Sequence, residues 1–189
     1  SREYEFLARD LLLSFEELAR LTTIAVGVGV EKVRITGGEP LLRKDLEQLI
    51  AMLGAIDGLA DITLTTNGVL LDRKAEALAA AGLRRVTVSL DSLDDEVFMQ
   101  MNDVGFPVQK VLDGIEAAAG AGLAPIKVNM VVKRGVNDHS VLEMAEHFRG
   151  TGHVVRFIEY MDVGTTNGWR LDDVVPAVEI LEQIGARYP

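Results

Sequence analysis

Short segments rich in Val, Ile, Leu and Thr alternate along the chain with longer segments whose apolar residues recur at helical spacing. Strand side chains alternate between two faces, whereas apolar residues three or four apart share one face of a helix. The pattern predicts five strands, at 33–36, 62–66, 85–90, 126–132 and 154–160. Alternating strands and helices indicate an α/β fold in which right-handed crossovers join parallel strands.

Helical segments lie between these strands, and several have residues suited to helix ends. Ser14 and Glu17 have the spacing of a capping box, which predicts a helix that carries Leu18. Asp72 is predicted to cap a helix over 73–81 that ends at Gly82. Further helices are predicted from residue 45 onward and over 107–121, 140–149 and 176–184, and the acidic run 94–96 favours another helix start.

The chain begins with a helical segment instead of a strand, and no linker or composition shift divides it. We therefore expect a single domain over residues 1–189. A closed barrel of eight strand–helix units typically needs about 250 residues. The chain thus predicts either an open α/β sheet or part of a TIM-type barrel from which pieces are missing.

One face of the predicted sheet is polar along all five strands. Strands covered on both sides are normally apolar throughout, yet residues of one parity here are polar, namely Lys32, Arg34, Thr36, Thr63, Thr65, Thr87, Ser89, Asp91, Lys127, Asn129 and Arg156. Because burying unpaired charge is costly, the cations among them predict a cavity for an anionic ligand or for internal carboxylates. Alternatively, individual Lys and Arg side chains near strand ends reach solvent.

The carboxyl ends of the strands form a second polar series. The first strand runs into Gly37-Gly38-Glu39-Pro40, and polar residues also lie at the ends of three other strands, at 65–68, 89–92 and 159–162. Ligands of parallel α/β folds bind at this edge. Glycine lets a ligand approach the backbone, and a carboxylate accepts hydrogen bonds, so the turn suits an ammonium group. An ordinary turn between strand and helix is the alternative.

Composition excludes several classes of function. The 189 residues include no cysteine and have a formal net charge of −10. The charge argues against a nucleic-acid binder, and the lack of cysteine excludes disulfides and thiolate metal sites within this chain. No apolar run is long enough to span a bilayer, and no signal peptide is recognisable. We therefore expect a cytoplasmic protein with no membrane partner. The three histidines lack the spacing of a helical metal pair.

Several of these segments resemble one known family and occur in its order. They are residues 32–41, which contain Gly-Gly-Glu-Pro, and residues 64–68, 86–92, 127–129 and 156–164. Together they resemble the radical S-adenosylmethionine enzymes and, among these, the GTP 3′,8-cyclase family of molybdenum cofactor (molybdopterin) biosynthesis. Many radical enzymes share Gly-Gly-Glu-Pro, whereas its combination with the later segments is far more specific. The resemblance runs over nearly the whole chain.

The resemblance implies an incomplete (β/α)6 barrel, of which this chain contributes five parallel strands. It implies binding of S-adenosyl-L-methionine by Gly37, Gly38, Glu39, Ser89 and Met161, and binding of GTP by Lys32, Arg34, Thr65, Lys127 and Arg156. The family reaction is a radical lyase reaction that converts GTP to 3′,8-cyclo-7,8-dihydro-GTP. Adenosylmethionine and two 4Fe-4S iron–sulfur clusters are its cofactors, and they supply the difficult chemistry while the protein binds and orients the reactants.

The absence of cysteine is the main departure from the family. Its first cluster is bound through C-x-x-x-C-x-x-C, which is expected before Ser1, and its second cluster region is expected after Pro189. Neither cluster can form on residues 1–189 alone. We therefore expect an inactive internal fragment with no catalytic residue of its own. Missing strands would expose edges and apolar surface, so we also expect self-association into a homo-oligomer.

Two other functions remain open at this point. The chain could belong to another radical enzyme, which acts on a peptide or a metabolite. The cationic residues disfavour this alternative, because a triphosphate suits them best. A cluster-free α/β module that binds a phosphorylated metabolite is the third possibility, and it fits the absence of cysteine directly.

Overall fold

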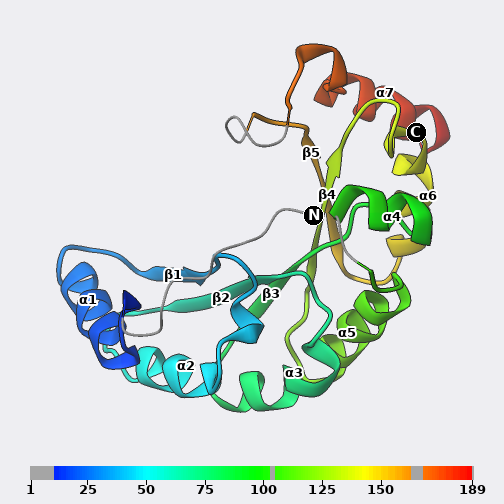
Figure 1. The fold of residues 1–189 in the computed structure, drawn as a ribbon. Helices are drawn as coiled ribbons and strands as arrows, with labels where there is room; N and C mark the ends of the chain where they lie inside the picture. The colour runs from blue at the N-terminus through cyan, green and yellow to red at the C-terminus, as the bar shows by residue number, and fades with distance from the viewer. Residues whose placement is uncertain (1–10, 103–104, 163–167, 189) are drawn as a thin grey trace.

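The computed structural model describes residues 11–102, 105–162 and 168–188. Its centre is one sheet of five parallel strands in the order β1-β2-β3-β4-β5 (Figure 1). The strands are β1 (Lys32–Ile35), β2 (Asp61–Thr66), β3 (Arg85–Ser89), β4 (Lys127–Val132) and β5 (Val154–Glu159). Every predicted strand is present, so the α/β prediction is confirmed. Residues 163 and 164, which end the last family-like segment, lie outside the described residues.

Helices connect the strands and lie along the outer side of the curved sheet (Figure 1). The α-helices are α1 (Phe15–Gly27), α2 (Leu46–Gly54), α3 (Leu71–Ala80), α4 (Asp95–Asn102), α5 (Gln109–Gly120), α6 (Val141–Phe148) and α7 (Ala177–Arg187), and the short 3-10 helices are η2 (Pro40–Leu42), η3 (Asp138–Ser140) and η4 (Leu171–Asp173). The predicted capping box begins α1: Ser14 Oγ accepts from Glu17 N at 3.1 Å, and Ser14 N donates to Glu17 Oε2 at 2.7 Å.

Asp72 does not cap α3 as predicted. The helix begins one residue before it, at Leu71, whose N–H donates to the carbonyl of Gly68 at 3.1 Å. Leu71 is fully buried, so the turn that places it in the core starts the helix earlier than the polar signal suggests. Asp72 instead lies in the first turn, where its negative charge complements the helix dipole. At the other end of the chain, α7 continues beyond the predicted residue 184 to Arg187.

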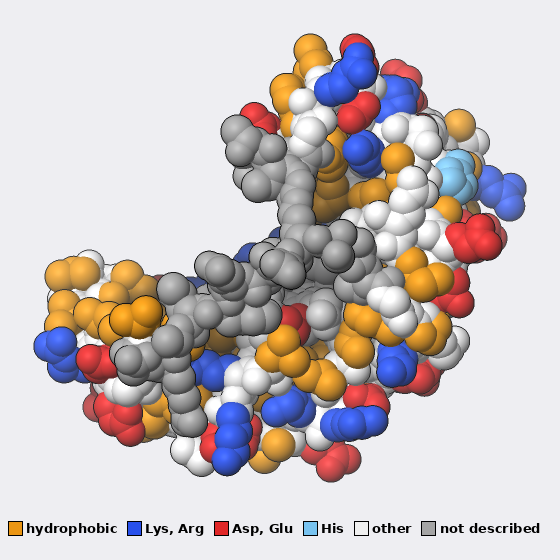
Figure 2. Space-filling model, viewed as in Figure 1, with side chains coloured by type: hydrophobic (Ala, Val, Ile, Leu, Met, Phe, Trp, Pro, Cys, Tyr) orange, Lys and Arg blue, Asp and Glu red, His pale blue; other side chains and the backbone are white. Residues whose placement is uncertain are grey.

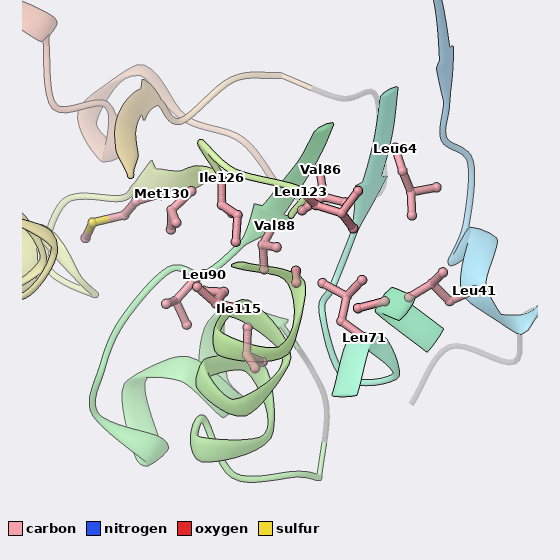
Figure 3. Packing of buried hydrophobic residues seen from close by; sticks show 14 of the residues in the cluster. Leu41, Leu64, Leu71, Val86, Val88, Leu90, Ile115, Leu123, Ile126 and Met130 are labelled. Carbon is pink, nitrogen blue, oxygen red and sulfur yellow. The ribbon is translucent and has the colours of Figure 1, made fainter. Parts of the chain in front are cut away.

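The hydrophobic core lies between the sheet and the helices. One parity of strand residues, including Leu64, Val86, Val88 and Met130, is buried against side chains such as Leu71 and Ile115 (Figure 3). The contact between the α3 and α5 regions is very close at Gly114, since a Cβ there would lie 2.3 Å from the carbonyl oxygen of Gly68. Burial of this parity leaves the opposite parity, which is the polar one, on the inner face of the sheet.

The sheet remains open, with β1 and β5 as its edges in the part of the chain that the structure describes. Apolar side chains in and just after α1 are also exposed: Leu21, Ile24 and Val28 are 46%, 56% and 82% exposed. Charged side chains of both signs are distributed over the outer surface (Figure 2). Within the described residues, no helix combines the length and the apolar character needed to cross a membrane.

Candidate functional site

The turn after β1 has the backbone shape that only glycine adopts easily. Gly37 has φ of 101° and Gly38 has φ of 45°, both in the left-handed region. Both residues are exposed, and a Cβ built on either would meet no atom within 4 Å. Open space therefore lies in front of this part of the backbone, at the carboxyl end of the sheet. The turn can accept a ligand against its main chain.

Glu39 fastens this turn to the neighbouring strand. Its Oε1 accepts from the N–H of Leu41 at 3.0 Å and from Thr66 Oγ1 at 2.6 Å, and its Oε2 accepts from the N–H of Asn67 at 2.7 Å. Thr66 in turn accepts from the N–H of Gly68 at 3.1 Å. A carboxylate has about four lone-pair positions, so protein donors occupy most of them. The main role of Glu39 is therefore to hold the turn in position. One lone-pair position on Oε2 remains available to a hydrogen-bond donor of a ligand.

The strand register brings the predicted cations to one face. Lys32 pairs with Asp61, Arg34 with Thr63, and Thr63 with Arg85. Further along, Thr65 pairs with Thr87, which pairs with Lys127, and Asn129 pairs with Arg156. Because side chains alternate with period two, all of these residues lie on the inner face. The inner face is hereafter the surface formed by Lys32, Arg34, Asp61, Thr63, Thr65, Arg85, Thr87, Ser89, Lys127, Asn129 and Arg156.

Positive charge predominates on the inner face. Asp61 is its carboxylate, with Oδ2 3.0 Å from Lys32 Nζ and hydrogen-bonded to Arg85. Burial first, and then the positive charges of Arg156, Arg85, Lys32 and Arg34, hold the pKa of Lys127 below its usual value. Among the described residues, Arg34, Lys127 and Arg156 form no ion pair; Arg156 Nε donates instead to Asn129 Oδ1 at 2.9 Å. The inner face is therefore suited to an anion.

The hydroxyl of Thr65 is a second indication, after the unpaired cations, that the inner face binds a ligand. It is buried, and within the described residues it has no hydrogen-bond partner. Buried polar groups in native proteins are nearly always hydrogen-bonded. The register places Thr65 in the same row as Thr87 and Lys127, in the middle of the inner face. An anionic ligand with acceptor oxygens would satisfy this hydroxyl and neutralise the neighbouring cations together.

The carboxyl ends of β3 and β4 are joined by a buried polar network. Asp91 Oδ1 accepts from the N–H of Val131 at 2.7 Å, and Asn137 Nδ2 donates to the carbonyls of Asp91 and Val131, each at 2.8 Å. Burial raises the pKa of Asp91 to about 6, although the hydrogen bond from Val131 opposes the rise. The network fixes the end of β3, and with it Ser89, which lies on the inner face just before the turn.

Met161 lies apart from this network, after the end of β5. Its side chain is 52% exposed, and it lines an open hollow of about 500 Å³ together with Ile158, Tyr160 and Trp169. Trp169 Nε1 donates to the carbonyl of Tyr160 at 3.1 Å, and Lys133 Nζ lies 4.6 Å from the centre of the Tyr160 ring. Met161 therefore has room beside it at the same edge of the sheet as the glycine turn.

The structure thus brings the predicted GTP-binding residues onto one face and places the predicted adenosylmethionine-binding residues at the carboxyl edge. Asp61 and Arg85 also lie on this face, although they were not among the predicted site residues. Each is the first residue of its strand, where a charged side chain resembles the end of a loop. The alternation of side chains along a strand could have identified both residues. Asp61 is two residues before Thr63, and Arg85 is two residues before Thr87, so each pair lies on the same face.

No iron–sulfur cluster fits on this chain. The sequence has no cysteine, and in the described ranges no group of His, Asp and Glu side chains could hold a metal ion. Adenosylmethionine fits better, because the open glycine turn and the remaining direction on Glu39 Oε2 can receive an amino group. The turn and the inner face can therefore receive an amino group and an anion, whereas the described residues offer no ligand set for a cluster.

Comparison with known proteins gives one family. The family model of the radical SAM superfamily matches residues 4–148. The chain is 53% identical over 186 residues to a protein named GTP 3′,8-cyclase from Acidothermus cellulolyticus, covering 98% of this chain and 51% of the relative. It is 56% identical over 177 residues to a GTP 3′,8-cyclase from Xanthomonas axonopodis pv. citri, covering 94% and 53%. The chain spans about half the length of the curated relatives it matches.

Solved structures agree on the fold. A radical SAM methyltransferase from Sphaerobacter thermophilus superposes with a TM-score of 0.70 at 18% identity, covering 93% of this chain and 56% of that structure. The anSMEcpe protein with bound AdoMet and the Cp18Cys peptide also gives a TM-score of 0.70, at 17% identity and with 98% and 53% coverage. The five parallel strands therefore belong to a partial TIM-type barrel of the radical SAM kind, which confirms the predicted fold.

Proposed function

We propose, because this chain belongs to the radical SAM superfamily, that it is the central part of a GTP 3′,8-cyclase. The complete protein would convert GTP to 3′,8-cyclo-7,8-dihydro-GTP for the biosynthesis of the molybdenum cofactor. The observation that carries the proposal is the inner face, where Arg34, Lys127 and Arg156 lie without carboxylate partners among the described residues. A triphosphate is the part of GTP that such a face recognises.

The GTP site would consist of Lys32, Arg34, Thr65, Lys127 and Arg156. Thr65 supports this assignment independently of charge, because its buried hydroxyl has no partner within the described residues. Lys127 supports it electrostatically, since neighbouring positive charges disfavour its own charge in the absence of an anion. A bound phosphate would remove both costs.

The adenosylmethionine site would consist of Gly37, Gly38, Glu39, Ser89 and Met161, all at the carboxyl edge of the sheet. Bound adenosylmethionine supplies the radical chemistry of the superfamily. The residues of this chain would hold it: the glycine turn receives its amino group, Ser89 its carboxylate, and Met161 contacts the rest of the molecule. Glu39 keeps the turn in place through Leu41, Thr66 and Asn67, so it would act on the cofactor mainly by positioning.

Residues 1–189 alone would not perform the reaction, because they lack cysteine for either cluster. The cluster ligands would lie in the half of the protein that this chain does not cover, so residues 1–189 would form one domain within a longer radical SAM core. A cytoplasmic location and a homo-oligomeric assembly are part of the same proposal.

The test compares two charge reversals in the protein encoded by the complete gene. Lys127→Glu changes the inner face, and Lys110→Glu makes the same change on the exposed surface of α5. A charge pair at about 4 Å contributes about 4 kcal/mol at an effective dielectric constant of about 20. We therefore expect Lys127→Glu to weaken GTP binding by at least about tenfold, since tenfold corresponds to only about 1.4 kcal/mol.

Isothermal titration with GTP and with adenosylmethionine measures both affinities. Adenosylmethionine binding should stay unchanged in Lys127→Glu, and both affinities should stay unchanged in Lys110→Glu. If Lys127→Glu weakened the binding of GTP and of adenosylmethionine equally, or did not weaken GTP binding, the result would favour a radical enzyme that acts on another substrate.

A further inference from the structure

Arg85 and Asp61 form a charged pair at the amino end of the inner face. Arg85 Nη2 donates to Asp61 Oδ2, and the same oxygen lies 3.0 Å from Lys32 Nζ. The Asp61 side chain is 16% exposed, whereas the Arg85 and Lys32 side chains are 39% and 45% exposed. One largely covered carboxylate therefore orients two cations whose remaining donors are accessible.

The Arg85 guanidinium has more donors than this pair uses. A guanidinium carries five N–H donors in a planar fork that matches phosphate oxygens. Asp61 is the one side-chain acceptor of Arg85 in the part of the chain that the structure describes. Arg85 is also among the charges that lower the pKa of Lys127, so the two cations act on the same space.

The cations are arranged in successive rows along the strands. Arg156 shares a row with Asn129 and Ser89 near the carboxyl edge, and Lys127 lies in the next row with Thr87. Arg34 and Arg85 flank Thr63 in the third row, and Lys32 lies beside Asp61 in the fourth. With a rise of about 3.3 Å per residue, six residues separate the first row from the last by about 20 Å.

This arrangement of cations determines how an elongated anion would lie along the strands. The reacting sugar of a nucleotide must lie beside adenosylmethionine at the carboxyl edge, so its phosphates would extend along the inner face toward the amino ends of the strands. The last phosphate would then be the one nearest to the third and fourth rows. A nucleoside monophosphate, whose only phosphate adjoins the sugar, would not reach them.

We propose that Arg85, oriented by Asp61, is a further phosphate-binding residue that selects a nucleoside triphosphate over the monophosphate. The inference rests on the proposed GTP substrate for the identity of the nucleotide, but the phosphate contact stands on the geometry of the rows. Asp61 acts as a positioning residue, because its one oxygen Oδ2 holds both Arg85 and Lys32.

The experiment uses the protein encoded by the complete gene in three forms: wild type, Arg85→Gln and Arg84→Gln. Arg84 is the matched control, since it is the preceding arginine, has the opposite parity and is exposed. Isothermal titration measures the affinities for GTP, GMP and inorganic tripolyphosphate. We expect Arg85→Gln to weaken binding of GTP and tripolyphosphate at least about tenfold while GMP changes less than about twofold. Arg84→Gln should match the wild type.

Two results would overturn the inference: equal weakening of GTP and GMP by Arg85→Gln, or no weakening of either. If the wild type binds GTP and only the Arg85 effect is absent, the inference fails and the proposed function stands. If GTP does not bind but tripolyphosphate does and responds to Arg85→Gln, the proposed function fails and the phosphate site stands.

Arg85→Lys covers the case in which Arg85→Gln fails to fold, which circular dichroism would reveal. This variant keeps the charge and loses the planar fork. We expect a GTP affinity below that of the wild type, with GMP affinity unchanged. Wild-type selectivity for GTP over GMP in Arg85→Lys would count against the inference.

Discussion

Replacing Glu39 by glutamine tests the connection that holds the glycine turn to β2. The substitution keeps the size and shape of the side chain but exchanges one acceptor oxygen for an NH2 group. In the structure, the two carboxylate oxygens accept three hydrogen bonds, from the N–H groups of Leu41 and Asn67 and from the hydroxyl of Thr66. In Glu39→Gln, at least one of these donors must face another donor.

The expected cost follows from the number and type of bonds lost. A hydrogen bond to a charged group contributes about 1.5–3 kcal/mol to stability. Glu39 is only partly buried, so we expect Glu39→Gln to lower the free energy of unfolding by about 2 kcal/mol. For a chain of this length, that corresponds to a decrease in melting temperature of about 4–8 °C.

Urea titration and thermal unfolding, both followed by circular dichroism, measure the change. Glu76→Gln is the matched control, because Glu76 is exposed on α3 and such surface substitutions usually change stability by less than about 0.5 kcal/mol. Thr66→Val removes the 2.6 Å donor and completes a double-mutant cycle. Contacting residues should give a coupling energy of at least about 0.5 kcal/mol. Stability of Glu39→Gln equal to that of the control, together with full additivity, would refute the connection.

Two further predictions concern pH and association. Burial raises the pKa of Asp91 to about 6 from an ordinary value of 3.8, so the native state binds the proton of this carboxyl group more tightly than the unfolded state does. The stabilisation of the native state by the protonated Asp91 is complete below about pH 4 and is lost as the pH rises through about 6. The unfolding free energy of Asp91→Asn relative to the wild type should therefore rise by up to about 3 kcal/mol between pH 4 and pH 7, because each tenfold difference in proton affinity corresponds to about 1.4 kcal/mol, and parallel pH profiles would contradict this reasoning. Residues 1–189 should self-associate through the open β1 edge and the exposed Leu21, Ile24 and Val28; light scattering should show that Ile24→Glu shifts the chain toward monomer, and a monomeric parent chain would argue against this contact.

Local patterns in the sequence were sufficient to predict the sheet. Each strand is a short segment that is rich in Val, Ile, Leu or Thr and lies between helical segments. Period two also predicted the inner face, because the register of a parallel sheet keeps one parity on one side. The helix start at Leu71 was not predicted, since burial in the core decided it and outweighed the capping preference of Asp72.

The partners of Glu39 could not be read from the sequence. Thr66 and Asn67 are 27 and 28 residues away, and nothing in local spacing connects them to the turn. The sequence therefore indicated a carboxylate that is available to a ligand, whereas the structure shows one largely used by the protein. Pairing between strands, which is a long-range property, decides which polar groups are free for function.

The same distinction explains how a chain with a net charge of −10 can offer an anion site. The outer surface formed by the helices carries both signs of charge (Figure 2), while the inner face carries Lys32, Arg34, Arg85, Lys127 and Arg156 against Asp61. The charges of the helices point into solvent on the far side of the sheet, and exposed charges more than about 8 Å apart are largely screened at physiological salt. The acidic helices therefore do not neutralise the inner face, and its affinity for phosphate should depend on Asp61 far more than on the total charge.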